Sequence, residues 1–131
     1  MPIYNCISPV NGIPMAAREK VATGITDAHC NSTGAPRNFV HVFFREVAQA
    51  NERFDKPFFI EGVNRAGRPA EVVLALKKEL RKALSDGAGV PLEQVGARIT
   101  ESPASWVMEG GDILPEPGEE DAKWFAAGES A

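Results

Sequence analysis

An internal repeat is the feature of this sequence that most restricts its fold. A shift of 55 residues aligns Pro2–Glu46 with Pro57–Glu101 without a gap, and eight of the 45 aligned pairs are identical. Five of those eight pairs are glycine or proline. Because these residue types mark where helices and strands begin and end, the two copies are expected to contain the same elements in the same order.

Each copy has the pattern of a β-α-β unit. It opens with a short β-prone run, and a proline then stands where a first helical turn tolerates a missing N–H. Apolar residues follow at helical spacing, and a glycine ends each helix. The apolar stripes are Ala17, Val21, Ile25 and Ala28 in the first copy and Val72, Val73, Leu76, Leu80 and Leu84 in the second. The predicted elements are strands Ile3–Ile7, Phe39–Glu46, Phe58–Gly62 and Gln94–Glu101, helices that begin at Pro14 and Pro69, and helix ends at Gly34 and at Gly87 or Gly89.

Two such units predict an α+β fold. Strand–helix–strand connections are right-handed crossovers, so the helices fall on one face of a four-stranded sheet. The other face is apolar and must be buried. Several copies could close their open faces into a ring, or the carboxy-terminal arm could cover the face. Association is the simpler solution and is the one that we expect.

The carboxy-terminal arm, residues 102–131, lies outside the repeat. It is rich in Pro, Gly and Glu, and it also carries Trp106, Trp124 and Phe125. This mixture predicts an arm that wraps around the protein on aromatic anchors and has a loose end. Residues 1–131 are therefore expected to form a single domain.

Composition and charge exclude several classes of protein. The formal net charge of -4 argues against nucleic-acid binding as the main role. Cys6 and Cys30 provide neither a disulfide framework nor metal-ligand spacing. No apolar stretch approaches the roughly 18 residues of a membrane span, and the first residues do not resemble a signal peptide. A cytoplasmic protein without a membrane segment is expected.

Positions at which the two copies differ are candidates for chemistry. His29 aligns with Leu84, directly after an apolar stripe. It is either a buried histidine bonded to a backbone carbonyl or a residue that points into a cleft. Arg65 and Arg68 align with apolar residues and precede the second helix. Two guanidinium groups at a helix start suit a carboxylate, although two solvated loop arginines would give the same pattern.

Pro2 and Glu109 are further candidates. An initiator methionine is normally removed before proline, which would leave a secondary amine at the chain terminus. The pKa of such an amine lies near 8, roughly, and nearby cations and burial lower it toward the range of a general acid or base. Many proteins begin Met-Pro without using it. Glu109 stands among apolar residues, which can raise a carboxyl pKa, but it could also be an exposed acid of the arm.

The sequence resembles the tautomerase superfamily and, within it, the cis-3-chloroacrylic acid dehalogenase group. The resemblance rests on Met1-Pro2 before a short strand, on the duplicated β-α-β unit and on several local segments. It covers nearly the whole chain. The segments are Ile25–His29, Gly62–Arg68, Glu101–Ala104, Glu109–Gly110, Leu114–Gly118 and Trp124–Phe125.

The resemblance implies an active site made of an amino-terminal proline, a histidine, two arginines, a tyrosine and a glutamate. Five of these fall on matching residues, and the tyrosine position falls on Arg98. An arginine there is expected to pair with Glu109 or to bind the substrate carboxylate, and it would weaken the activation of water. The implied catalytic residues are Pro2, His29 and Glu109, and the implied substrate-binding residues are Arg65, Arg68 and Arg98.

These residues lead to three hypotheses about function. The first is a tautomerase that ketonises 2-hydroxy-2-enoates, with Pro2 as acid and base. The second is a hydratase or dehalogenase of 3-substituted acrylates, with Glu109 activating water. The third is a ring that binds a partner and retains no chemistry. For the enzymes, the resemblance implies a small carboxylate substrate, no metal or organic cofactor and a homotrimer.

Overall fold

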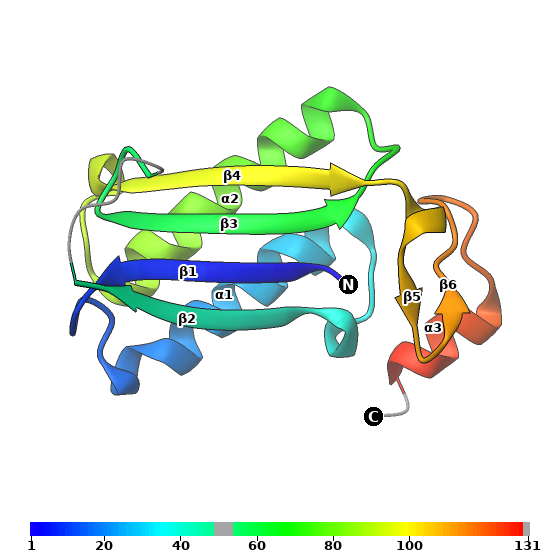
Figure 1. The fold of residues 1–131 in the computed structure, drawn as a ribbon, viewed down its shortest axis with the longest axis horizontal. Helices are drawn as coiled ribbons and strands as arrows, with labels where there is room; N and C mark the ends of the chain where they lie inside the picture. The colour runs from blue at the N-terminus through cyan, green and yellow to red at the C-terminus, as the bar shows by residue number, and fades with distance from the viewer. Residues whose placement is uncertain (49–53, 130–131) are drawn as a thin grey trace.

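The computed structural model describes residues 1–48 and 54–129. It shows the predicted α+β fold, in which a four-stranded sheet carries helices α1 and α2 on one face (Figure 1). The helices and strands are β1 (Ile3–Pro9), α1 (Met15–Thr33), β2 (His41–Val47), β3 (Phe58–Arg65), α2 (Ala70–Ala88), β4 (Val95–Ser102), β5 (Met108–Glu109), β6 (Asp112–Ile113) and α3 (Ala122–Glu129).

The sheet has the strand order β2-β1-β3-β4. Strand β1 runs parallel to β2, and β3 runs parallel to β4, so each copy forms a parallel β-α-β unit. The two copies join where β1 pairs antiparallel with β3, with Ile3 opposite Val63 and Ile7 opposite Phe59. The duplicated unit predicted from the repeat is therefore present.

The two long helices occupy equivalent positions in the repeat. Their bounds differ by 55 residues, since α1 spans 15–33 and α2 spans 70–88. Gly34 and Gly89 end them in the left-handed conformation, with φ of 75° and 70°. Gly87, the alternative end, lies inside α2, where a Cβ would come within 2.7 Å of Val21 Cγ2. Gly87 therefore allows close packing of the helices and does not end one. None of the helices in these ranges has the length and apolar character needed to cross a membrane.

The core lies between the sheet and the two helices. Residues of the predicted stripes are buried there, including Val21 and Ile25 of α1 and Leu76, Leu80 and Leu84 of α2. Burial of several such side chains, at about 2 kcal/mol each, is the main term that holds the helices against the sheet.

The opposite face of the sheet remains open within one chain. Ile3 is exposed there, and 53% of Phe43 is accessible to solvent. The arm does not cover this face, because β5, β6 and α3 lie beyond one end of the sheet (Figure 1). The alternative in which the arm buries the open face is therefore wrong.

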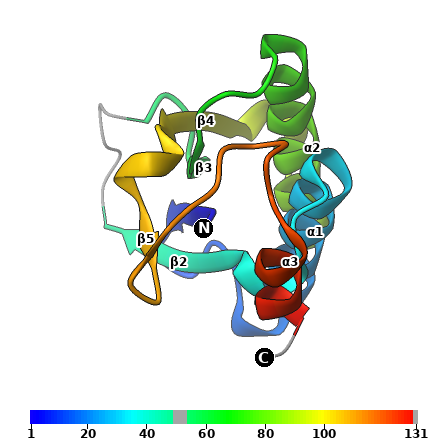
Figure 2. The same ribbon diagram turned by 90° about the vertical axis from the view of Figure 1, so that its right-hand side faces the viewer.

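The arm loops around the start of β1, as Figure 2 shows. Trp124 of α3 anchors it, with its ring 4.8 Å from that of Phe39 and 5.0 Å from that of Phe125. Trp106 is 78% exposed, so the prediction that it also serves as an anchor is wrong. The arm thus brings residues of the carboxy-terminal end around the amino terminus.

Candidate active site

The amino terminus lies beside Glu109. The Met1 ammonium donates a hydrogen bond of 2.6 Å to Oε2 of Glu109, while the Pro2 side chain is buried and its carbonyl accepts the N–H of His41. The other carboxylate oxygen of Glu109 is buried without a hydrogen-bond partner among the described residues. Strand β5 thus brings an incompletely bonded carboxylate to the start of the chain.

His29 is buried in a polar cluster at the end of α1. Only 1% of it is exposed, and its Nδ1 lies 2.7 Å from the hydroxyl of Tyr4, which also accepts a 3.2 Å hydrogen bond from Asn64 Nδ2. With Asn64 Nδ2 as the donor to Tyr4, we assign the hydroxyl as the donor to Nδ1. The proton of a neutral ring then resides on Nε2. His29 is therefore buried, as the first of its two interpretations predicts, but its Nδ1 is bonded to a tyrosine hydroxyl and not to a backbone carbonyl.

The electrostatic environment keeps His29 neutral. Burial, followed by the charges of Arg68, Arg65 and the amino terminus, lowers the pKa of His29 to about 3. All three cationic groups are therefore near enough to act on one imidazole. At neutral pH His29 can donate a hydrogen bond but cannot act as a cationic acid.

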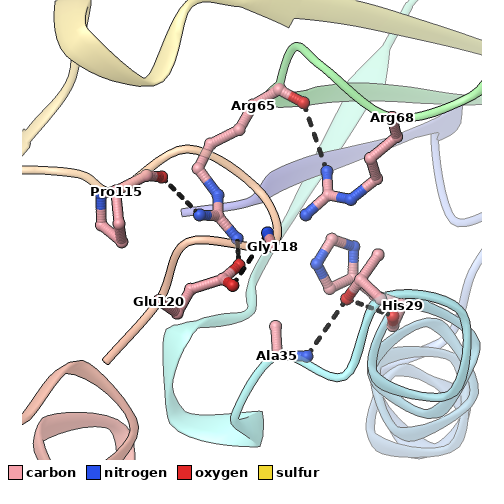
Figure 3. Close-up of polar contacts among 8 residues, drawn as sticks. His29, Ala35, Arg65, Arg68, Pro115, Gly118 and Glu120 are labelled. Atoms are coloured by element: carbon pink, nitrogen blue, oxygen red, sulfur yellow. Dashed lines mark hydrogen bonds and ion pairs between the residues drawn. The ribbon is translucent and has the colours of Figure 1, made fainter. Parts of the chain in front are cut away.

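The guanidinium of Arg65 is bound by residues of the arm. Arg65 is 4% exposed, and its guanidinium donates to the Pro115 carbonyl at 2.6 Å and to Oε1 of Glu120 at 3.0 Å (Figure 3). Its guanidinium carbon also lies 5.0 Å from the centre of the Trp124 ring. Arg65 therefore ties the arm to the end of β3 through two of its five N–H donors.

Arg68 is more open than Arg65. One of its terminal nitrogens donates to the Arg65 carbonyl at 3.2 Å, and the guanidinium lies toward the His29 ring (Figure 3). The pKa of Arg68 is lowered by burial and by Arg65, although Tyr4, Glu120 and Glu101 oppose this. Arg68 retains donors that a substrate carboxylate could accept from.

Arg98 lies apart from the other candidates. It projects from β4 on the open face, pairs with Glu61 of β3, and stands 5.9 Å from the centre of the Phe59 ring. Glu109 pairs with the amino terminus instead. Within one chain, the expected contact between Arg98 and Glu109 is therefore not formed.

A cavity of about 490 Å³ adjoins the site beneath the arm. Pro115 and Trp124, which hold Arg65, line it, and so does Glu109, which holds the amino terminus. The remaining walls combine apolar and charged side chains. They are Phe39, Gly110, Asp112, Ile113, Leu114, Glu119, Asp121, Lys123 and Ala127.

Sequence reasoning missed three residues that organise the site, Tyr4, Asn64 and Glu120. Tyr4 aligns with Phe59 and Asn64 with Pro9, so the comparison of the two copies could have singled out both as polar departures. Glu120 has no counterpart in the repeat and stands in an acidic run, where nothing distinguishes it from its neighbours.

Taken together, the site offers three chemical functions. The start of the chain can carry an amine beside a carboxylate, Arg68 can bind an anion, and neutral His29 can donate a hydrogen bond. Such a set suits proton transfer on a small carboxylate without a redox step.

Comparisons of structure, but not of sequence, relate the chain to known proteins. No protein-family model matches the sequence, and no curated protein matches it by sequence. A member of the cis-3-chloroacrylic acid dehalogenase (cis-CaaD) family has a similar structure, with 30% identity, a TM-score of 0.83, and coverage of 95% of this chain and 90% of that protein.

Two further structures share the fold. A wild-type fused 4-OT, solved as an asymmetric trimer, is 20% identical, with a TM-score of 0.74 over 85% of this chain and 94% of its own. Macrophage migration inhibitory factor of Toxoplasma gondii is 19% identical, with a TM-score of 0.70 over 86% and 99%. The chain belongs to the tautomerase superfamily and lies close to its cis-3-chloroacrylic acid dehalogenase family.

Proposed function

We propose that this protein is an enzyme that converts the enol form of 2-hydroxy-2-enoates into the keto form. Pro2, exposed as a terminal amine by removal of Met1, is its general acid and base. One observation carries the proposal: the amino terminus, Arg65 and Arg68 all act on the buried ring of His29, and Arg68 lies toward that ring (Figure 3). The expected location of the enzyme is the cytoplasm.

The proposed reaction moves one proton. Arg68 holds the substrate carboxylate, and the Nε2–H of His29 donates to the oxygen on the neighbouring carbon. The neutral amine of Pro2 takes the hydroxyl proton, so the O–H bond breaks and the C=O bond forms. The electrons of the C=C bond then take that proton from Pro2 at the third carbon. Enol and ketone balance without a cofactor.

A second candidate is the hydration or dehalogenation of 3-substituted acrylates. The unpartnered oxygen of Glu109 favours it, because a carboxylate with a free oxygen can remove a proton from water. The water oxygen would add to the third carbon while cationic Pro2 protonates the second. A halide on the third carbon would then leave with its bonding electrons, while the new hydroxyl loses its proton and the C=O bond forms.

We also propose that the protein is a homotrimer. The open sheet face, with Ile3 and Phe43 exposed, provides an apolar surface for association. Arg98 lies on this face, so it would reach a substrate only in the site of a neighbouring subunit.

The test is the spectrophotometric decay of phenylenolpyruvate with protein shown by mass spectrometry to begin at Pro2. Rapid ketonisation is expected. Pro2→Ala should slow it by about 100-fold or more, because a general acid and base contributes that much. Protein that retains Met1 is the matched control. It should be inactive, because its strand β1 is unchanged but its Pro2 nitrogen is an amide.

Substitution of Glu109 distinguishes the two candidate reactions. Glu109→Gln should abolish hydration of a 3-haloacrylate if that is the principal reaction. It should leave most of the ketonisation if Pro2 is the only acid and base. Absence of ketonisation by correctly processed protein would shift the assignment to acrylate hydration.

A further inference from the structure

The pair of Arg65 and Glu120 fixes the charge of the site. Glu120 is only 12% exposed, and both of its carboxylate oxygens are engaged: Oε1 accepts from Arg65 at 3.0 Å, and Oε2 accepts the Gly118 N–H at 2.9 Å. Burial raises the pKa of the Glu120 carboxyl, but hydrogen bonds from its own backbone, Arg65 and Gly118 outweigh this and lower it overall. At neutral pH Glu120 is thus a carboxylate that serves as the counter-ion of Arg65.

Counting charges shows what remains for a ligand. Glu120 neutralises Arg65. His29 is neutral, so of Arg65, Arg68 and His29 only Arg68 is a cation without a carboxylate partner at hydrogen-bond distance among the described residues. Glu101, which also acts on Arg68, is exposed and therefore screened by water. One positive charge therefore remains among Arg65, Arg68 and His29, and a single ligand carboxylate balances it.

The adjoining cavity disfavours a second negative charge. Its lining includes Asp112, Glu119 and Asp121, with Lys123 as the only cation among the lining residues. A ligand that extends from Arg68 past Trp124 into this cavity would bring a distal carboxylate close to these acids.

From these two observations we propose that Glu120 is a specificity-determining residue, which cancels Arg65 and restricts the site to ligands with one carboxylate and an uncharged remainder. The proposal rests on the proposed function, because it concerns the same site. Glu120 acts through Arg65 and need not touch the ligand.

The experiment measures binding, so that it does not depend on turnover. Two keto acids of equal length are compared by calorimetry: 2-oxohexanoate, and 2-oxoadipate, which differs by a terminal carboxylate. The protein that begins at Pro2 should bind 2-oxohexanoate about tenfold more tightly. Glu120→Gln frees Arg65, so this ratio should move about tenfold toward 2-oxoadipate.

Two variants control for other effects. Glu116→Gln removes the same charge from an exposed position of the arm and should leave the ratio within about twofold of the wild type. Arg65→Gln combined with Glu120→Gln removes both charges of the pair, so its ratio should return toward the wild-type value. Near-ultraviolet circular dichroism establishes that each variant keeps the packing of Trp124.

The outcomes separate this proposal from the proposed function. Equal or tighter binding of 2-oxoadipate by the wild type, no binding of either acid, or equal shifts in Glu120→Gln and Glu116→Gln would overturn it, whatever the ketonisation assay shows. Selective binding with the predicted shift, in a protein that ketonises nothing, would support the charge assignment and reject only the tautomerase.

Discussion

The hydroxyl of Tyr4 lies 2.7 Å from Nδ1 of His29, and the two rings meet edge to face, with centroids 5.7 Å apart. Strand β1 supplies the tyrosine and the end of helix α1 supplies the histidine. Because both side chains are buried, the bond fixes the ring orientation and the site of its proton. The contact therefore joins the core of the protein to the candidate site.

Stability should depend on pH through His29. Its folded pKa of about 3 lies below the usual value near 6.5, so between these values only the unfolded chain binds the proton. Stability is then lost as the pH falls from 6.5 toward 3. Between pH 7 and pH 5 the wild type should lose about 2 kcal/mol more than His29→Gln. Urea denaturation at both pH values measures the difference.

His41→Gln separates the effect of burial from the effect of removing any histidine. His41 is the other histidine of the chain and is exposed on β2. An equal loss of the pH effect in His41→Gln and His29→Gln would contradict the assignment to the buried ring.

The position of Tyr4 should depend on Gly62. A Cβ at residue 62 would lie 2.6 Å from Cε1 and 2.8 Å from Cδ1 of the Tyr4 ring. Gly62→Ala should therefore displace the ring, reduce stability by about 1–3 kcal/mol and lower activity, because His29 moves with Tyr4. Thermal denaturation and the ketonisation assay test both effects.

Gly24→Ala is the matched control. Its added Cβ would meet the Cβ of Ala83 at 3.2 Å, and alanine favours a helix over glycine by about 1 kcal/mol. It should therefore change stability little and leave activity intact. Equal losses in the two variants would mean that Gly62 has no special relation to Tyr4.

The sequence predicts the fold because both copies of the repeat contain the residues that begin and end each helix. Pro14 and Pro69, with Gly34 and Gly89, delimit two helices with bounds 55 residues apart. The strands extend beyond the predicted bounds: β1 reaches Pro9 and β3 reaches Arg65, because ladder pairing stabilises residues that have little β propensity of their own.

Much less of the site follows from sequence patterns. Figure 3 shows His29, Arg65 and Arg68 near one another, and Glu109 bonds to the amino terminus beside Pro2. The catalytic and binding roles that the family resemblance implies for these residues stay predictions. No local sequence pattern reveals that Glu120 pairs with Arg65 or that Arg98 pairs with Glu61. Both ion pairs depend on how distant segments of the chain pack together. Long-range ion pairs of this kind have no periodic signature.

Arg65 and Arg68 should respond differently to substitution. Arg68→Gln should raise KM for phenylenolpyruvate by about 10- to 100-fold, since a charge-assisted hydrogen bond contributes about 1.5–3 kcal/mol. Arg65→Gln should instead cost about 1–3 kcal/mol of stability, because it leaves the part-buried carboxylate of Glu120 without its cation. Steady-state kinetics and urea denaturation of both variants test this division. A larger rise in KM for Arg65→Gln, with unchanged stability, would reverse the two roles.

The open sheet face should control assembly. Phe43 projects from β2 on that face opposite Asn5, and 53% of it is exposed in one chain. In the proposed trimer it is buried, so Phe43→Glu would place a charge in an apolar contact and should yield monomers in sedimentation velocity. Leu74→Glu makes the same kind of change at an exposed leucine of α2, away from the sheet, and should leave the trimer intact. A Phe43→Glu protein that sediments as the wild type does would place the subunit contacts elsewhere, and the open face would then need another partner.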